Sequence, residues 1–320
     1  MKTRQLGTSD LQITPILMGT WQAGKRMWAG IEDQETIKAI RAAFEAGITT
    51  IDTAEIYGEG HSERMVAQAL GDVRDRAVYA SKVFSTHLAY DQVIAACEGS
   101  LKNLQTDYID LYQIHWPAGT WNTPLVPIAE TMNALNTLKE QGKIRAIGVS
   151  NFSLPQLQEA AQYGTIESLQ PPYSLFWRQI EGEQMPYCVE NQITILAYSS
   201  LAQGFLTGKF GRDHQFVEGD HRYQNKLFQP EHYGRVQDAL DQLRPIAARY
   251  DCSLAQLALA WLIAQPQTCA IAGARYASQV LDNAQAATIE LSPADLVTIS
   301  DIGETVAAPF RQERVLWAFT

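Results

Sequence analysis

The chain has 320 residues, of which 46% are hydrophobic and 19% are charged, and its formal net charge is -10. This length suits one large α/β barrel or two ordinary domains, because single barrels commonly run past about 250 residues. The acidic balance argues against nonspecific binding to nucleic acid or to an anionic membrane, although it leaves room for one local basic pocket.

Cysteine usage and the first residues of the chain bear on its compartment. The four cysteines, Cys97, Cys188, Cys252 and Cys269, are widely spaced and form no C-x-x-C pair. We therefore expect reduced thiols, with neither a disulfide framework nor a metal site. The first ten residues are polar and no apolar run approaches the length of a membrane span, which indicates a cytoplasmic protein with no membrane partner.

Short apolar runs alternate with amphipathic helical segments along almost the whole chain. The expected strands cover residues 16–19, 49–52, 78–82, 109–115, 144–149, 168–170, 193–197 and 269–272. The expected helices cover residues 35–46, 62–70, 90–103, 126–140, 154–163, 181–190, 235–250 and 254–263. Ser62 is placed to cap the second helix, and Gly71 follows its end.

Eight strand candidates, mostly followed by helices, indicate a parallel sheet that closes into a barrel. An open doubly wound sheet is the alternative, but it would carry a G-x-G-x-x-G turn after the first strand, and the sequence has none there. Residues 3–15 are typical of a β-hairpin, and the polar stretch 209–233 interrupts the unit after the seventh strand. We expect one α/β domain over residues 1–320, a (β/α)8 TIM barrel with an N-terminal β-hairpin and extra C-terminal helices.

Three familiar motifs fail on inspection. The G-E-G of residues 58–60 begins like a dinucleotide fingerprint, but Glu63 stands where the third glycine is required. The G-V-S of residues 148–150 begins like a nucleophile elbow, but Phe152 replaces the closing glycine. The six histidines show no metal-ligand spacing. The sequence therefore favours neither a serine hydrolase nor a metalloenzyme.

Polar side chains stand at the ends of three neighbouring strands. Asp52, Lys82 and His115 close the second, third and fourth strands, and Tyr57 follows Asp52 by five residues. Each alone is more often structural, but the carboxyl ends of barrel strands are where active sites form, and four together favour a catalytic site. A cation beside a tyrosine favours the phenolate, so we expect Lys82 to lower the pKa of Tyr57 and make it a general acid.

Five segments stand out in chain order: L-G-T-S-D-L at residues 6–11, I-D-T-A-E-I-Y-G at 51–58, D-Y-I-D-L-Y-Q-I-H-W-P at 107–117, I-G-V-S-N-F at 147–152 and Q-P-P-Y at 170–173. Through these segments the chain resembles the aldo-keto reductase superfamily, of the bacterial NADPH-dependent type, over nearly its full length. This resemblance implies catalytic roles for Asp52, Tyr57, Lys82 and His115. It also implies an oxidoreductase that reduces aldehydes and ketones with hydride from nicotinamide C4 of NADPH, Tyr57 being the proton donor.

The resemblance further implies how the cofactor is held. Ser150, Asn151 and Gln170 would bind the carboxamide, Tyr198 would stack on the nicotinamide ring, and Arg275 would meet the 2′-phosphate of NADPH. The full expected cofactor set is Gly19, Thr20, Trp21, Asp52, Ser150, Asn151, Gln170, Tyr198, Ser199, Ser200, Leu201, Gln203, Gly204, Leu206, Gly208, Lys209, Gly273, Ala274, Arg275, Gln279 and Asn283.

The expected partner is a small carbonyl substrate. Trp21, Phe84 and Trp116 are candidates for an apolar wall beside Tyr57 and His115, although ordinary core packing also explains them. Substrate specificity in such barrels resides in loops and tails, which here are residues 116–127, 209–233 and 307–320.

Two other functions stay open at this point. Relatives of the superfamily that associate with potassium channels keep the barrel and the cofactor but act as redox-sensing regulatory subunits. Turnover with small aldehydes would favour an enzyme, whereas a tightly held cofactor with little turnover would favour a sensor. A lyase or isomerase that uses Lys82 as a Schiff-base amine is the third interpretation, and borohydride trapping would reveal its adduct.

Overall fold

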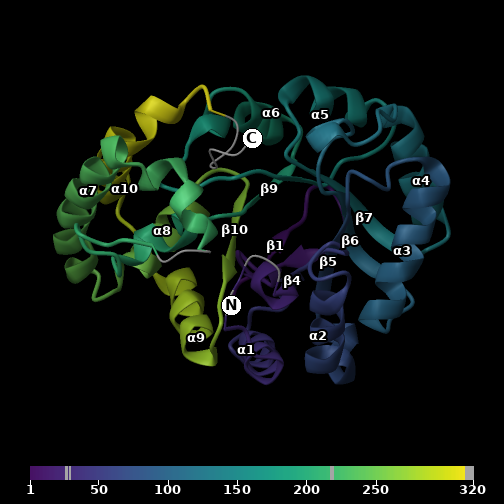
Figure 1. Ribbon diagram of the computed structural model, residues 1–320, viewed down its shortest axis with the longest axis horizontal. Coiled ribbons are helices and arrows are strands. Elements are labelled where there is room, and N and C mark those ends of the chain that lie inside the picture. Colours follow the sequence, from purple (N-terminus) through teal and green to yellow (C-terminus); the bar gives the residue numbers. More distant parts are fainter. Residues whose placement is uncertain (26–27, 29, 217–219, 314–320) are drawn as a thin grey trace.

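Eight parallel strands close into a barrel that is surrounded by helices (Figure 1). The computed structural model describes residues 1–25, 28, 30–216 and 220–313. Around the barrel the strands follow the order β10-β3-β4-β5-β6-β7-β8-β9. Their bounds are β3 Ile16–Gly19, β4 Thr50–Asp52, β5 Val78–Val83, β6 Ile109–Ile114, β7 Ile144–Ser150, β8 Ser168–Gln170, β9 Thr194–Ala197 and β10 Thr268–Gly273. The predicted barrel is confirmed.

The helices form the outer layer of the molecule (Figure 1). Their bounds are α1 Asp33–Glu45, α2 His61–Leu70, α3 Tyr90–Leu104, α4 Ile128–Glu140, α5 Leu154–Ala161, α6 Gln184–Glu190, α7 Pro230–Arg249, α8 Leu254–Ile263, α9 Ala277–Gln285 and α10 Pro293–Ala307. Two helices, α7 and α8, separate β9 from β10, and α9 and α10 follow the last strand. The expected C-terminal helices are therefore present, and α10 packs against α7.

A short antiparallel hairpin, β1 (Arg4–Gln5) and β2 (Gln12–Ile13), precedes the barrel as predicted. Leu6, Leu11 and Ile13 are buried in one cluster with apolar residues of the barrel strands. The Glu167 carboxylate, just before β8, accepts from the backbone N–H of Thr8 at 2.7 Å. The hairpin thereby covers the amino-terminal mouth of the barrel and leaves the opposite mouth for other use.

Element boundaries differ from the predictions at several helices. Helix α2 begins at His61, and its N-cap is Gly60 with a φ of 78°, so Ser62 does not cap it. Helix α7 begins at Pro230, five residues before the predicted start, because proline at the first helical position is itself a start signal. The helix expected over residues 181–190 begins only at Gln184 in α6, and Glu181 belongs to a separate 3-10 turn, Gln179–Glu181.

The polar stretch after β9 is organised by aromatic residues that are spread along the sequence. Phe205, Phe210, Phe216 and Phe228 form a chain of ring contacts with centroid separations between 3.4 and 6.0 Å. Short 3-10 turns at His221–Gln224 and Lys226–Phe228 connect this cluster to α7. A segment that looks irregular in sequence is thus held by aromatic residues that belong to the main hydrophobic core or pack against it.

The remaining expectations concern thiols, metals and membranes. The thiols of Cys97, Cys188, Cys252 and Cys269 are free, and burial raises the pKa of Cys97 to about 12 and of Cys269 to about 11. Among the described residues, no group of three His, Cys, Asp or Glu side chains is arranged to hold a metal ion. Within the same part of the chain, no helix combines the length and the apolar character that a membrane crossing needs.

Candidate active site

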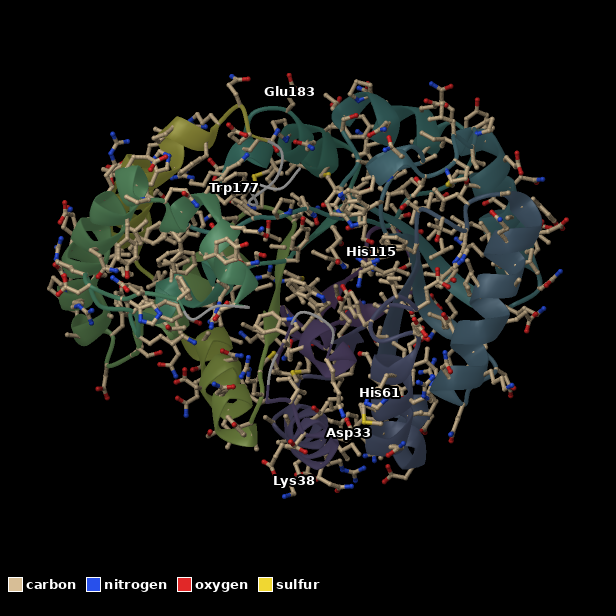
Figure 2. The ribbon with its side chains drawn as sticks, in the orientation of Figure 1. Asp33, Lys38, His61, His115, Trp177 and Glu183 are labelled. Atoms are coloured by element: carbon tan, nitrogen blue, oxygen red, sulfur yellow. The ribbon has the colours of Figure 1, made fainter. Side chains whose placement is uncertain are left out.

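Three of the predicted catalytic residues lie on adjacent strands at the carboxyl-terminal mouth. Asp52 ends β4, Lys82 lies in β5 opposite Gln113 of β6, and His115 directly follows β6. Lys82 is 0% exposed, Asp52 3% and His115 9%. Figure 2 shows His115 inside the ring of helices, whereas His61 and Asp33 lie at its rim. The strand register therefore brings these side chains together, as the sequence pattern predicts.

Lys82 and Asp52 form a buried ion pair. The Lys82 Nζ atom donates to Asp52 Oδ1 at 2.7 Å and to the carbonyl oxygen of Thr53 at 2.7 Å. The other carboxylate oxygen, Oδ2, accepts from Gln170 Nε2 at 2.9 Å. Burial lowers the pKa of Lys82, while the charge of Asp52 acts in the opposite direction. Both charges are therefore held by several hydrogen bonds, which a buried pair requires.

Tyr57 lies against both partners. Its ring centroid is 5.1 Å from Lys82 Nζ and 5.6 Å from the centroid of the His115 ring. Burial raises the pKa of Tyr57 well above its ordinary value, and the charge of Asp52 adds to this effect. The expected lowering by Lys82 does not prevail, because the ammonium is engaged by Asp52 and a buried phenolate is poorly solvated. Tyr57 therefore keeps its proton far above neutral pH.

His115 is a neutral ring in this setting. Burial, followed by the charge of Lys82, lowers the pKa of His115 well below its ordinary value of 6.5. Its Nδ1 atom is buried without a hydrogen-bond partner among the described residues. A neutral imidazole carries one proton, and an N–H without an acceptor is costly, so the proton belongs on Nε2. His115 is thus arranged as a hydrogen-bond donor through Nε2.

The residues expected around a carboxamide form one hydrogen-bonded group. Ser150 Oγ donates to the Gln170 carbonyl oxygen at 2.8 Å, and Asn151 Nδ2 donates to Ser150 Oγ at 3.0 Å. Tyr198 Oη donates to Asn151 Oδ1 at 2.8 Å. Asn151 holds a φ of 62°, and its Nδ2 atom also donates to the His115 carbonyl oxygen at 3.0 Å. The group therefore joins β7, β8 and β9 beside the ion pair.

The segment after β9 contains several residues in the left-handed region of backbone conformation. Ser199, Ala202, Gln203 and Gly204 all have positive φ values, and Gly208 follows with a φ of 68°. The backbone N–H groups of Ala202, Gly204 and Gly208 donate to carbonyl oxygens within the segment, so its turns are closed by their own hydrogen bonds. The Nε2 atom of Gln203 is buried with no hydrogen-bond partner among the described residues, so a donor is left without an acceptor there.

Cationic side chains gather beside this segment. The pKa of Lys209 lies below its ordinary value because its surroundings desolvate it and because Arg222 and Arg275 are near. Asp220 pairs with Arg222 at 2.5 Å, which offsets one of the three positive charges. Cations that lower one another's proton affinity fit a site for a polyanion. The donor set therefore fits a phosphorylated dinucleotide such as NADPH.

The loop after β10 lies next to the loop after β3. The Arg275 guanidinium lies 5.5 Å from the Trp28 ring centroid, and the Arg275 backbone N–H donates to Gln279 Oε1 at 2.7 Å. Gln22 donates to the Ala274 carbonyl oxygen at 2.8 Å. The other expected cofactor residues are placed as follows: Gly19 and Gly273 end β3 and β10, Thr20 and Trp21 follow β3, Ser200, Leu201 and Leu206 follow β9, and Asn283 lies within α9.

The aromatic residues expected at the substrate wall divide into two groups. The Phe84 ring lies 5.7 Å from the His115 ring and stacks at 5.8 Å on Trp121, which contacts Trp116 at 4.7 Å. Trp21 instead contacts Trp28 at 5.2 Å, on the side of Arg275. The sequence interpretation missed Trp121, although a large aromatic residue in the 116–127 loop was a signal for it. Its side chain is 48% exposed and its φ is 53°.

The structure describes the three predicted specificity segments to different extents. Residues 116–127 are described throughout. Residues 217–219 of the 209–233 stretch and residues 314–320 of the tail lie outside the described residues. Within the tail, the 3-10 turn Ala308–Phe310 places Phe310 in a stacked contact with Trp177, at a centroid separation of 5.3 Å.

Comparisons with known proteins agree with this geometry. The model of the Aldo/keto reductase family matches residues 15–304. The chain is 39% identical over 292 residues to aldo-keto reductase YhdN of Bacillus subtilis, covering 88% of this chain and 87% of that one. It is 37% identical over 330 residues to the NADH-specific methylglyoxal reductase of Escherichia coli, covering 96% and 99%.

A solved structure extends the likeness to the whole fold. The aldo/keto reductase from Klebsiella pneumoniae in complex with NADP and acetate superposes with a TM-score of 0.78 at 32% identity, covering 99% of this chain and 98% of that one. The strand order, the site at the carboxyl mouth, the family match and these two relatives point the same way. The chain belongs to the aldo/keto reductase family of oxidoreductases.

Proposed function

We propose that this protein is an NADPH-dependent reductase of small aldehydes and ketones that works in the cytoplasm, with Tyr57 as its proton donor. The observation that carries the proposal is the buried Lys82–Asp52 pair, 2.7 Å between Nζ and Oδ1, placed against the rings of Tyr57 and His115. A charge pair held away from solvent at a barrel mouth is expensive to bury, and its use in catalysis explains why it is there.

The side chains have distinct tasks in this mechanism. When bound, NADPH supplies the hydride that nicotinamide C4 delivers to the carbonyl carbon. The Tyr57 hydroxyl donates its proton to the carbonyl oxygen, so that one hydride and one proton make the alcohol. His115 donates a hydrogen bond from Nε2 to the same oxygen. Donors aimed at the oxygen help most, because negative charge develops there in the transition state.

Lys82 acts through Tyr57 rather than on the substrate. Tyr57 starts as a phenol whose pKa is raised by burial, so the hydroxyl is protonated but is a weak acid. Positive charge beside the ring stabilises the phenolate as the proton moves. Asp52 orients Lys82 and keeps it charged. The same pairing disfavours a Schiff-base role, because an ammonium that donates to Asp52 and to the Thr53 carbonyl oxygen is no nucleophile.

The choice of NADPH over NADH rests on the cations at the far end of the site. Arg275 and Lys209 lie close enough for Arg275 to lower the pKa of Lys209, which suits the extra phosphate of NADPH. One relative is named as an NADH-specific methylglyoxal reductase, and the Klebsiella pneumoniae structure holds NADP, so the family uses both. Methylglyoxal is the first substrate to test, because two Escherichia coli relatives are named as its reductases.

The decisive experiment is cofactor consumption by the purified chain. NADPH and NADH are each offered with methylglyoxal, other small aldehydes, ketones and sugars. We expect steady turnover with at least one small aldehyde and a preference for NADPH. Tightly bound cofactor that is not consumed with any carbonyl would favour the regulatory subunit instead. Faster turnover with NADH than with NADPH would overturn the assignment of Arg275.

A further inference from the structure

Three hydroxyl side chains form a buried cluster beside the ion pair. Thr20 follows β3, Thr53 follows β4 and Ser62 lies in the first turn of α2; they are 1%, 1% and 0% exposed. Ser62 Oγ lies 2.7 Å from Thr20 Oγ1 and 2.8 Å from Thr53 Oγ1. Ser62 is therefore the point at which two strand ends and one helix meet.

Helix capping does not explain Ser62. The N-cap of α2 is Gly60, and no side chain caps this helix. The Ser62 hydroxyl instead donates to the carbonyl oxygen of Thr20 at 3.0 Å. The backbone N–H of Ser62 donates to the carbonyl oxygen of Tyr57 at 3.1 Å. One residue thus holds the loop that carries Tyr57 through its backbone and the hydroxyl cluster through its side chain.

The direction of the hydrogen bonds follows from counting protons. A hydroxyl has one proton to donate. Thr20 Oγ1 donates to the carbonyl oxygen of Asp52 at 2.9 Å, which leaves the single Ser62 proton to serve both contacts with Thr20, 2.7 Å to Oγ1 and 3.0 Å to the carbonyl oxygen. The remaining contact, between Thr53 and Ser62, must then use the proton of Thr53. The chain of donors runs from Thr53 through Ser62 and Thr20 to the Asp52 carbonyl oxygen.

The two ends of this chain are the two residues that accept from Lys82. The Lys82 ammonium donates to Asp52 Oδ1 and to the Thr53 carbonyl oxygen, each at 2.7 Å. We propose that Ser62 is a positioning residue for the reduction: its hydroxyl links Thr53 to Thr20 and so fixes the two oxygen atoms that hold Lys82 beneath Tyr57. This inference rests on the proposed function, since it requires that Lys82 assist proton donation by Tyr57.

Thr53 offers a matched pair of variants. Thr53→Val keeps the shape of the side chain and removes the hydroxyl, whereas Thr53→Ser removes a methyl group and keeps the hydroxyl. Ser62→Ala removes the central member of the chain. Thr268→Val is the control: Thr268 is also fully buried, and its hydroxyl donates to the Pro266 carbonyl oxygen at 2.8 Å, at the amino end of β10.

The first readout is the single-turnover rate of methylglyoxal reduction with saturating NADPH. A shift of a reacting group by about 1 Å costs roughly 10²-fold, so a partial loosening in Ser62→Ala and Thr53→Val should cost about tenfold. Thr53→Ser and Thr268→Val should stay within about twofold of the parent. NADPH affinity, measured by fluorescence titration, should be the same in Thr53→Val and Thr53→Ser.

The second readout is the pH at which the reduction rate falls on the alkaline side of the pH profile. A merely structural role of Ser62 would not move this pH. Weaker hydrogen bonds to the ammonium lower the pKa of Lys82, so this pH should be lower in Ser62→Ala and Thr53→Val. The titratable groups that face Lys82 are Asp52, Glu63, Tyr57 and His115, and none of them is changed. Lysine 13Cε NMR, with Lys82→Met to assign the resonance, follows the same pKa without turnover.

The outcomes separate the two levels of the proposal. Slow reduction by Thr53→Val, near-parental reduction by Thr53→Ser and a lowered Lys82 pKa support the positioning role. Parental rates and an unmoved pKa in Ser62→Ala and Thr53→Val overturn it while leaving the reductase in place. Equal losses in Thr53→Ser and Thr53→Val also overturn it, because packing would then explain both. A parent that reduces no carbonyl overturns the proposed function and this inference together.

Discussion

The two mouths of the barrel are built on opposite principles. At the amino-terminal mouth the hairpin buries Leu6 and Leu11 against apolar residues of the barrel strands, and the Thr8 N–H donates to Glu167. At the carboxyl-terminal mouth, the Lys82–Asp52 pair is buried beside Tyr57 and His115. Buried side-chain atoms without a partner among the described residues occur at both ends, for example Thr14 Oγ1 and His115 Nδ1. The contrast therefore lies between an apolar plug and a buried charge pair, and active sites of such barrels form at the carboxyl end.

Backbone conformation does not separate the two mouths in this way. The carboxyl mouth holds non-glycine residues with positive φ at Asn151, Ser199 and Gln203. At the hairpin turn the residue with positive φ is Gly7, with a φ of 56°, for which the conformation costs little. Gln192 and Gln267, which lie just before β9 and β10 at the amino end, also have positive φ values, of 55° and 54°. The side chains at the two mouths, and not the backbone, are therefore the reason to expect different consequences of substitution.

The largest effect is expected from Lys82→Met at the carboxyl mouth. Loss of the cation beside Tyr57 should lower single-turnover reduction by about 10²–10⁴-fold, the usual range for general acid catalysis. Removal of one partner from a buried ion pair should also cost about 3–5 kcal/mol of unfolding free energy, measured by urea denaturation. Adding Asp52→Asn should restore part of the stability but none of the rate. Recovery of the rate in the double variant would show that Lys82 is only structural.

A smaller effect is expected at the phosphate end of the same mouth. Arg275→Ala should weaken NADPH binding by about tenfold, since a charge-assisted contact contributes roughly 1.5–3 kcal/mol, and should leave NADH binding nearly unchanged. Fluorescence titration of both cofactors measures this directly. Arg311→Ala, which removes a cation paired with Glu304 near the C-terminus, serves as the control. Equal weakening for NADPH and NADH would remove Arg275 from the 2′-phosphate.

At the amino-terminal mouth the expected effect is on stability alone. Glu167→Ala removes the carboxylate that accepts from the Thr8 N–H, and because Thr8 is exposed and water can replace the acceptor, the unfolding free energy should fall by only about 0.5–1.5 kcal/mol. Glu167→Gln keeps an acceptor oxygen and should cost less. The single-turnover rate should stay at the parental value in both variants, because the barrel separates this end from the site. A change in that rate would break the proposed division between the two mouths.

The smallest expected effect is the acid limb of the pH profile. The pKa of His115 is lowered by burial and by Lys82, so the ring stays neutral below its ordinary value of 6.5. A limb caused by protonation of this ring must then lie below pH 6.5 and not at it. The pH dependence of kcat/KM measures this, with His115→Asn as the comparison. A limb at about 6.5 that disappears in His115→Asn would contradict the neutral ring.

The positions of the strand ends allowed most of the site residues to be predicted from the sequence. Apolar runs marked each barrel strand, and the polar residue that closes a strand, such as Asp52 or His115, must lie at the mouth once the strand is placed. The pKa direction of Tyr57 was predicted wrongly, because it depends on burial and on the engagement of Lys82 by Asp52. Burial of that kind is a property of the assembled barrel and not of local sequence.

The directions in which individual side chains point could not be predicted from the sequence either. Ser62 looks like a helix cap in the sequence, yet its hydroxyl points to Thr20 and Thr53 because the N-cap is Gly60, two residues earlier. Trp121 lies in a loop, and its own φ of 53° directs its ring onto Phe84. No periodic pattern in the sequence predicts such a turn. Both depend on backbone geometry within one or two residues, where pattern-based boundaries are least accurate.

The most direct test of the proposed chemistry compares two tyrosines that each lose one oxygen. Tyr57→Phe keeps the ring, so the fold and NADPH affinity should survive, while the single-turnover rate of methylglyoxal reduction should fall by about 10²–10⁴-fold. Tyr79→Phe removes a hydroxyl from β5 that is also buried, with a pKa raised to about 12, and should leave the rate unchanged. If Tyr57→Phe reduces the substrate at the rate of Tyr79→Phe, Tyr57 is not the proton donor and the proposed mechanism is wrong.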